Sequence, residues 1–247
     1  MTTHGGERLL VGRHLCFDVD ARRVLDDVSV TAGPGRILAV TGTSGSGKTT
    51  LLSLLGGLAR PTEGEASYDG GPVTTKQREP LPGTGFVLQS YGLVPTLTAA
   101  ENVAIAPRGR GVAAVDATER ALTALARVGV DELADRLISE LSGGQLQRVA
   151  VARALVVEAD VLLADEPTSE LDEAHRDLVV GQLRMEADRG AIVLLATHDP
   201  AVAEECDDEL HLVDGQVEVQ DAPPPPPEPG HEHDVYMRPA IDPGAAR

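Results

Sequence analysis

A glycine-rich loop between an apolar run and a helical run constrains this chain more than any other feature of its sequence. Residues 42–49 have the sequence Gly-Thr-Ser-Gly-Ser-Gly-Lys-Thr, directly after the apolar run Ile37–Thr41 and before a helical pattern at 50–58. In such a strand–loop–helix unit the glycines let backbone N–H groups converge on one point without a Cβ in the way. The segment therefore predicts a strand that ends in an anion-binding loop.

The loop satisfies the P-loop pattern, which indicates a site for nucleotide phosphates. The positive end of the following helix dipole would add to the backbone N–H groups. We expect Lys48 to reach the β- and γ-phosphates and the Thr49 hydroxyl to coordinate Mg²⁺. A compact ammonium fits between phosphates where a planar guanidinium does not, and this chain keeps only two lysines among its 21 basic residues. The residues predicted to bind phosphate are Gly42, Thr43, Ser44, Gly45, Ser46, Gly47, Lys48, Thr49 and Thr50.

An acidic pair follows a second apolar run. The run at 161–164 ends in Asp165 and Glu166, which places two carboxylates at the carboxyl edge of a sheet, where α/β proteins bind ligands. Asp165 is expected to hold Mg²⁺ directly or through water. Glu166 is the candidate general base that orients and deprotonates an attacking water.

Apolar strand-like runs alternate with helical patterns along the chain, which predicts an α/β fold with a mostly parallel central sheet. The runs 9–19 and 24–30 instead resemble antiparallel strands, so we expect an antiparallel β subdomain at the N-terminus. The region 90–157 is mostly helical and predicts an inserted helical subdomain. The other predicted strands lie at 37–41, 86–88, 161–164 and 192–197, and the predicted helices lie at 50–58, 118–128, 145–157 and 173–189.

The composition changes after residue 220. Residues 221–247 contain five consecutive prolines at 223–227 and scattered charge, so they bury too little apolar surface to offset the entropy of ordering. We therefore expect one domain over residues 1–220 and a disordered proline-rich tail at 221–247.

Charge and hydropathy exclude several classes of protein. The formal net charge of −18 argues against nucleic acid as a partner, because proteins that bind the phosphate backbone present basic patches. The longest apolar run, 191–196, is far shorter than the roughly 18 residues that span a bilayer. The segment 1–13 lacks the apolar stretch of a signal peptide. We expect a soluble intracellular protein that reaches a membrane only through a partner.

A further motif, Leu-Ser-Gly-Gly-Gln at 141–145, lies between the P-loop and the acidic strand. The order of P-loop, this signature, acidic strand and Thr197-His198-Asp199 resembles the ATPase subunit of an ABC transporter over residues 9–219. The resemblance implies ATP and Mg²⁺ as cofactors and a P-loop NTPase core. It also implies a head-to-tail dimer, in which each ATP lies between one subunit's P-loop and its partner's signature. The residues expected to bind nucleotide through the signature are Ser142, Gly143, Gly144 and Gln145.

Three further positions match this family. Gln89, after the strand at 86–88, resembles the glutamine that contacts Mg²⁺ and the attacking water. His198 resembles the switch histidine near the γ-phosphate. The segment 169–172 resembles the loop that crosses to the opposite site, although Glu170 replaces a residue that is usually small. The predicted catalytic residues are therefore Glu166, His198, Gln89 and Lys48, and the predicted metal ligands are Thr49, Gln89 and Asp165.

The aromatic residue that usually stacks on adenine is missing, because Val19 occupies its expected position. Phe17, two residues earlier, would lie on the same face of a strand. Either Phe17 replaces the aromatic residue and stacks on the base, or the adenine rests on an aliphatic surface.

The stretch 86–103 resembles the lipoprotein-releasing, macrolide-exporting and cell-division ATPases, which implies a separately encoded membrane permease whose short coupling helix docks beside Gln89 and residues 91–97. We therefore expect a cytoplasmic subunit, peripheral on the inner face of the cell membrane, of an exporter or mechanotransmission system. One alternative is the ATPase of a cell-division or cell-wall regulatory complex that transports no substrate. The other is a soluble ABC ATPase acting on nucleic acid or ribosomes, although those relatives usually have coiled-coil insertions, zinc modules or two cassettes.

Overall fold

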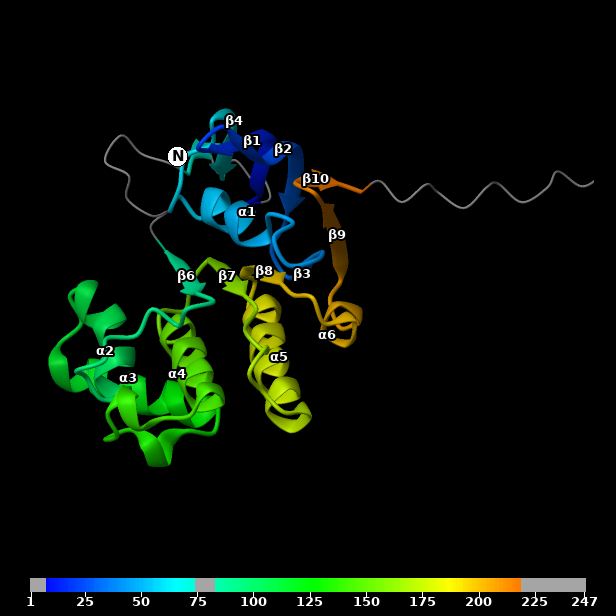
Figure 1. Ribbon diagram of the computed structural model, residues 1–247. Coiled ribbons are helices and arrows are strands. Elements are labelled where there is room, and N and C mark those ends of the chain that lie inside the picture. Colours follow the sequence, from blue (N-terminus) through cyan, green and yellow to red (C-terminus); the bar gives the residue numbers. More distant parts are fainter. Residues whose placement is uncertain (1–7, 74–82, 219–247) are drawn as a thin grey trace, which may run out of the picture.

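The computed structural model describes residues 8–73 and 83–218, and the tail predicted at 221–247 lies outside the described residues (Figure 1). A six-stranded sheet has the strand order β10-β9-β3-β8-β7-β6. Its strands from β9 to β6 are parallel, and β10 pairs antiparallel with β9. The strands are β3 (Ile37–Thr41), β6 (Thr84–Val87), β7 (Val161–Asp165), β8 (Ile192–Ala196), β9 (Asp208–Val213) and β10 (Gln216–Val217).

The register of this sheet brings three strand ends to one edge. Asp165, the last residue of β7, pairs with Ala196, the last residue of β8. Thr41, the last residue of β3, pairs with His211 of β9. Every residue of β3, β7 and β8 is buried, as expected of parallel strands that are covered on both faces. The loops that follow these strands therefore meet at the same edge.

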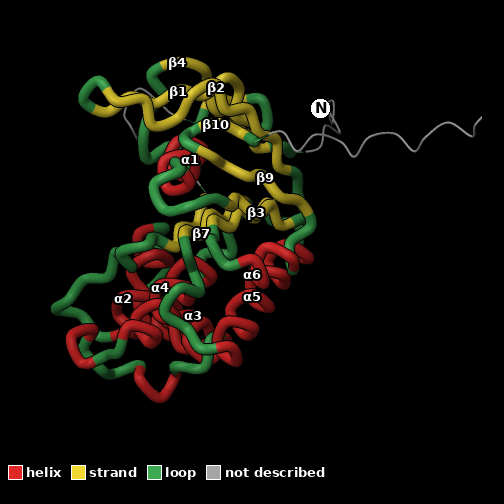
Figure 2. The backbone as a smooth tube through the Cα atoms, turned by 45° about the vertical axis from the view of Figure 1, so that its right-hand side comes forward, coloured by secondary structure: helices red, strands yellow, loops and turns green. Residues whose placement is uncertain are grey.

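A second, four-stranded antiparallel sheet has the order β2-β1-β4-β5 and lies on the opposite side of α1 from the central sheet (Figures 1 and 2). Its strands are β1 (Leu10–Val19), β2 (Arg22–Ala32), β4 (Glu63–Tyr68) and β5 (Gly71–Pro72). Helix α1 (Lys48–Leu55) fills the space between the two sheets with its buried leucines. One hydrophobic core includes these leucines, the inner face of the antiparallel sheet and one face of the central sheet.

The remaining helices cover the other face of the central sheet (Figure 1). They are α2 (Ala99–Gly109), α3 (Ala114–Arg127), α4 (Gly143–Leu155), α5 (Glu173–Asp188) and α6 (Pro200–Glu204), with 3₁₀ turns at Asp131–Leu133 and Ile138–Glu140. A second core packs the apolar faces of these helices against that sheet face. None of the helices in residues 8–73 and 83–218 is long and apolar enough to span a bilayer.

The structure confirms the predicted fold class: a mostly parallel sheet, an antiparallel β sheet at the N-terminus and a helical insertion between β6 and β7. Element ends differ from the prediction. Helix α1 begins at Lys48 and ends at Leu55, three residues before the predicted end, because Gly56 and Gly57 follow it. Helix α2 lies in the region that was predicted to be mostly helical, but it was not predicted as a separate helix. Its capping box, in which Thr98 and Glu101 bond each other's backbone N–H, is nevertheless visible in the sequence.

Strand β9 was not predicted either. It begins with two carboxylates, Asp208 and Glu209, and only Leu212 in it is buried. Such a half-exposed strand lacks the apolar run that marks β3, β7 and β8. The strand pairs with β3, and Asp207 just before it adds a further contact. The Oδ2 atom of Asp207 accepts a hydrogen bond from the buried Ile37 N–H at 2.7 Å and one from Arg184 at 2.8 Å.

Replacing Asp207 with alanine is expected to lower the free energy of unfolding by about 1–3 kcal/mol, because the buried Ile37 N–H would lose its acceptor. The hydrogen bond from Ile37, followed by that from Arg184, lowers the pKa of Asp207. The stabilisation is therefore present above the ordinary carboxyl pKa of about 3.9 and is lost as the pH falls through the lowered pKa. Chemical denaturation of both proteins between neutral and acidic pH measures this difference.

The matched control is Asp208→Ala, which removes only an exposed ion pair with Arg36. We expect a loss of about 0–1 kcal/mol for that variant. Equal losses for the two variants, or a loss at Asp207 that persists unchanged into acid, would contradict this role of Asp207.

Candidate phosphate-binding site

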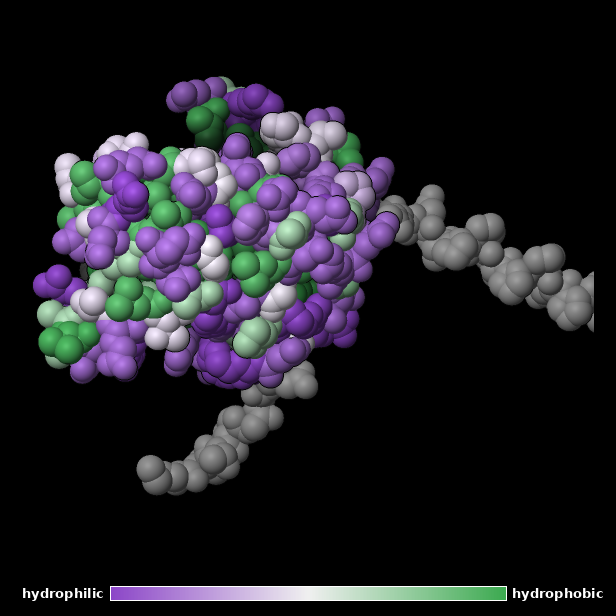
Figure 3. Space-filling view, turned by 90° about the horizontal axis from the view of Figure 1, so that it is seen from below, coloured by the Kyte–Doolittle hydropathy of each residue, from purple (hydrophilic) through white to green (hydrophobic). Residues whose placement is uncertain are grey.

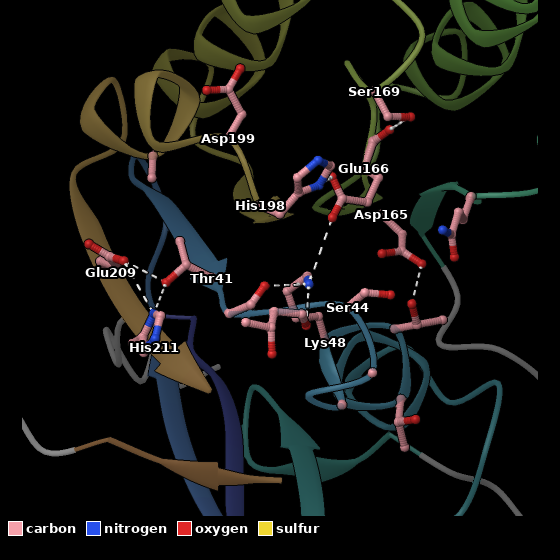
Figure 4. A pocket seen from close by; sticks show the side chains of 18 of the residues that line it. Thr41, Ser44, Lys48, Asp165, Glu166, Ser169, His198, Asp199, Glu209 and His211 are labelled. Carbon is pink, nitrogen blue, oxygen red and sulfur yellow. Dashed lines mark hydrogen bonds and ion pairs between the residues drawn. The ribbon is translucent and has the colours of Figure 1, made fainter. Parts of the chain in front are cut away.

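A cleft of about 860 Å³ opens at the edge where β3, β7 and β8 end (Figure 4). Several segments contribute to its wall: the glycine-rich loop and first turn of α1, Val24 of β2, the loop after β6, the end of β7 and the loop that follows it, the loop after β8 with α6, and β9. Most of the predicted site residues line it: Gly42, Thr43, Ser44, Gly45, Gly47, Lys48, Thr49, Thr50, Gln89, Asp165, Glu166 and His198. The exception in the loop is Ser46, which is buried behind it.

The shape of the loop requires glycine at its first position. Gly42 has a φ of 136°, and a Cβ there would lie 2.2 Å from the backbone oxygen of Leu212. Gly45, at the tip, also has a positive φ of 84°, but a Cβ there would meet nothing within 4 Å. The N-terminus of α1 at Gly47 has no side-chain cap, so its first backbone N–H groups are available to an anion. The loop and the uncapped helix N-terminus thus form a cradle of the kind that binds anions.

Lys48 lies inside this cradle and is only 7% exposed. Its Nζ donates hydrogen bonds to the carbonyl oxygens of Gly42 at 2.8 Å and Thr43 at 3.1 Å, and it lies 3.8 Å from Oε1 of Glu166. A buried ammonium is costly unless anions or carbonyl groups surround it. Lys48 is therefore held at the cleft wall in a position to pair with an anionic ligand.

Asp165 and Thr49 form the part of the cleft that suits a divalent cation. Thr49 Oγ1 donates to Oδ2 of Asp165 at 2.7 Å. The other oxygen, Oδ1, is buried and has no hydrogen-bond partner in the described residues. Burial, followed by the negative charge of Glu166, raises the pKa of Asp165, against the hydrogen bond from Thr49 and the charge of Lys48. A cation beside Oδ1 would satisfy this orphaned oxygen and favour the ionised carboxylate.

The donor set of this part of the cleft consists of oxygen atoms, which suits Mg²⁺. Mg²⁺ takes oxygen ligands and is usually bound by one or two carboxylates together with substrate phosphates and water. Asp165 and Thr49 supply such oxygens, and Gln89 lines the same cleft.

Glu166 is held in an unusual backbone conformation, with a φ of 50°. Its N–H donates to Ala196 O at 2.9 Å, and its carbonyl oxygen accepts from the side chain of Ser169 at 3.2 Å. Oε2 lies 2.9 Å from Nδ1 of His198, so the imidazole and the carboxylate point toward each other across the cleft (Figure 4). The carboxylate is thus directed into the cleft, opposite Lys48.

The signature residues lie outside this cleft. Ser142 caps α4, with its Oγ accepting from Gln145 N at 3.4 Å and Gln145 Oε1 accepting from Ser142 N at 2.9 Å. Gly144 is needed for close packing, because a Cβ there would lie 2.8 Å from Glu170 O. The structure therefore separates Ser142, Gly143, Gly144 and Gln145 from the other predicted site residues within one chain.

Neither residue considered for adenine stacking lines the cleft. Val19 is 47% exposed at the end of β1, and Phe17 packs against the core beneath the antiparallel sheet. Val24 lines the cleft instead, which favours an aliphatic surface for the adenine.

The sequence did not predict a polar group in the wall of the cleft that β9 contributes. In this group Thr41 Oγ1 donates to Glu209 at 2.5 Å and lies 2.8 Å from Nδ1 of His211. No local motif marks this group, because β9 reaches the cleft only through the sheet register.

Comparisons with known proteins agree with this geometry. The ABC transporter family profile matches residues 25–169. The macrolide export ATP-binding/permease protein MacB of Syntrophobacter fumaroxidans is 42% identical over 205 residues, which cover 80% of this chain and 29% of that protein. The lipoprotein-releasing system ATP-binding protein LolD 1 of Caulobacter vibrioides is 43% identical over 203 residues, which cover 79% of this chain and 86% of that protein. The chain thus spans less than a third of MacB but most of LolD 1.

A solved structure also matches. The ATP-binding cassette MJ0796, in a dimeric post-hydrolysis state bound to ADP and Pi, superposes with a TM-score of 0.78 at 31% identity. The match covers 85% of this chain and 97% of that one. The expected resemblance and the expected fold class are therefore both confirmed.

Lys48→Ala is expected to weaken binding of a nucleoside triphosphate roughly 10- to 100-fold, because hydrogen bonds to charged groups contribute about 1.5–3 kcal/mol. Titration calorimetry with ATP and Mg²⁺ measures this change. Lys76→Ala is the matched control, since Lys76 is the only other lysine of the sequence and has no assigned role. If Lys48→Ala binds ATP as tightly as the wild type does, the assignment of phosphate binding to this cradle is wrong.

Proposed function

The chain belongs to the ABC transporter family and is an ATPase that uses ATP with Mg²⁺, and from this premise we propose that it powers a separately encoded membrane permease of an export or mechanotransmission system. One observation carries the proposal: Lys48, Asp165 and Glu166 meet in one cleft, while the signature at 142–145 lies outside it. A second copy in head-to-tail orientation would supply the missing signature to each cleft. The dimeric state of the MJ0796 cassette supports this arrangement.

The proposed roles follow from the contacts. The phosphates bind to the loop from Gly42 to Gly47 and to the first turn of α1, which includes Thr50. Lys48 pairs with the terminal phosphates, for which it is already desolvated. Asp165, Thr49 and Gln89 hold Mg²⁺, which when bound supplies positive charge that offsets the charge of the phosphates. From a partner copy, Ser142, Gly143, Gly144 and Gln145 contact the same nucleotide with the N-terminus of α4.

Glu166 acts as the general base in this proposal. Its carboxylate orients a water molecule and takes a proton from it as the water oxygen attacks the terminal phosphorus. The bond between that phosphorus and the bridging oxygen breaks in the same step, and ADP and phosphate leave as the products. His198 contacts Oε2 of Glu166, which fixes the direction of the carboxylate and places the imidazole beside the phosphate position. The positive φ of Glu166 costs of order 1–3 kcal/mol and persists only because neighbouring hydrogen bonds hold it.

The permease would dock on the helical side of the molecule. Several large apolar side chains of α2, α3 and the adjoining loops are exposed there: Val94, Ile105, Val115, Leu122 and Leu137. Figure 3 shows apolar residues mixed with polar ones on this face. Gln89 follows β6 beside the same region, so a coupling helix docked against residues 91–97 would contact both the docking face and the segment that enters the cleft at Gln89. In this proposal the subunit works in the cytoplasm, peripheral on the inner face of the membrane.

The regulatory and nucleic-acid alternatives are not favoured. MacB is named for macrolide export and LolD 1 for lipoprotein release, and both are ATP-binding proteins of transport systems. Capture of the full-length chain from detergent-solubilised membranes tests the partner. An integral membrane protein is expected to co-purify, and its absence in the presence of ATP would overturn the permease proposal.

Glu166→Gln is expected to slow ATP hydrolysis roughly 10²- to 10⁴-fold, the usual contribution of a general base. Because the amide keeps the size of the side chain, ATP should still bind and an ATP-bound dimer should accumulate. Steady-state hydrolysis and size-exclusion chromatography with ATP measure the two effects.

Glu119→Gln, the same substitution at an exposed position of α3, is the matched control and should hydrolyse ATP at the normal rate. Unchanged hydrolysis in Glu166→Gln, with only monomer in the presence of ATP, would mean that another group is the base.

A further inference from the structure

One buried side chain that the proposed mechanism does not use connects the signature helix to the candidate base. Gln147 lies in the first turns of α4 and is 3% exposed. Its Nε2 donates to the backbone oxygen of Glu166 at 2.5 Å and lies 3.4 Å from Oγ of Ser169. Its Oε1 accepts from the backbone N–H of Glu170 at 2.8 Å. Both ends of the amide are therefore bonded to the segment 166–170.

The segment 166–170 contains the candidate general base and another residue of the cleft wall. Glu166 has its strained φ of 50°, and Ser169 lines the cleft. The carbonyl of Glu170 lies so close to Gly144 of the signature that a Cβ there would be 2.8 Å away. The segment is thus packed against the start of α4 at Gly144 and hydrogen-bonded to it at Gln147. A displacement of α4 would move both contacts together.

The direction of the Glu166 carboxylate depends on its backbone. Its N–H is fixed by the bond to Ala196 O in β8, which belongs to the sheet. Its carbonyl is fixed by Gln147 and Ser169. Ser169 belongs to the same segment, so Gln147 is the hydrogen-bonding side chain that ties this peptide group to a different element. Rotation of that peptide group would turn the carboxylate away from His198 and Lys48.

We propose that Gln147 is a positioning residue that couples the signature helix to the general base Glu166. The inference rests on the proposed function, in which the cleft and the signature of one chain contact two different nucleotides. A nucleotide bound at the signature pulls on the N-terminus of α4, and Gln147 transmits that displacement to the base that serves the other nucleotide. The coupling thus links the two ATP sites of the dimer within each subunit.

The test replaces Gln147 with methionine, which keeps the length and shape of the side chain and removes all three contacts. We expect kcat for ATP to fall roughly 10- to 100-fold, the scale of a misplacement of about 1 Å at a reacting group. The affinity of the monomer for ATP should stay unchanged, because Gln147 does not line the cleft. Because Gln147 links the two ATP sites in this proposal, the Hill coefficient of hydrolysis should be lower in Gln147→Met than in the wild type.

The matched control is Gln182→Met in α5, where Gln182 accepts a hydrogen bond from Arg127 and does not line the cleft. It should retain the wild-type kcat and Hill coefficient. Gln147→Leu provides a second variant should methionine prevent folding. It also removes the three contacts and leaves no buried charge, so kcat should fall while the fold is retained.

Hydrogen exchange at the Glu170 amide measures the contact directly and without ATP. Gln147→Met should speed its exchange relative to Gln182→Met. Any of three results would overturn the role of Gln147. The first is a kcat equal to that of the control, the second is a kcat loss matched by an equal loss of ATP affinity, and the third is unchanged exchange at Glu170. A wild-type chain that neither hydrolyses ATP nor dimerises would instead refute the proposed function, so the two failures are distinguishable.

Discussion

The burial of one ammonium and two carboxylates in a single cleft is the constraint on which the rest of the structure depends. Lys48, Asp165 and Glu166 are each less than a tenth exposed, and charges so placed are costly unless each has partners. The partners follow two different strands: the loop carbonyls and the Thr49 hydroxyl of α1 come after β3, and His198 comes after β8. Only a parallel sheet in this register brings these ends together, and two hydrophobic cores hold the sheet from both sides.

Helix α4 connects this cleft to the rest of the molecule. Its side chains bond the backbone of three other segments: Gln147 holds residues 166–170, Arg148 holds the carbonyls of Val128 and Gly129, and Arg153 holds those of Tyr91 and Gly92. Burial lowers the pKa of both arginines, and the carbonyl contacts offset part of that cost. The helix that begins at the signature is thus bonded both to the segment after Gln89 and to the segment of the base.

Prediction from sequence succeeded where short-range spacing fixes the structure. The strand–loop–helix unit around Lys48 was predictable because its glycines and its apolar strand are contiguous. The runs in β3, β7 and β8 were predictable because strands buried on both faces are continuously apolar. Prediction failed for β9, where acidic residues sit in a half-exposed strand, and for the group of Thr41, Glu209 and His211, which only the sheet register assembles.

The sequence by itself determined which residues can do chemistry on phosphate, because a glycine loop, a lysine and an acidic strand end are local patterns whose chemistry follows from residue type. Tertiary structure decided which of them meet. It brought Lys48, Asp165, Glu166 and His198 to one sheet edge and left the signature outside that cleft. It also joined Gln147 to the backbone of Glu166, a contact that no spacing predicts, because hydrogen bonds between distant segments depend on how helices pack on the sheet.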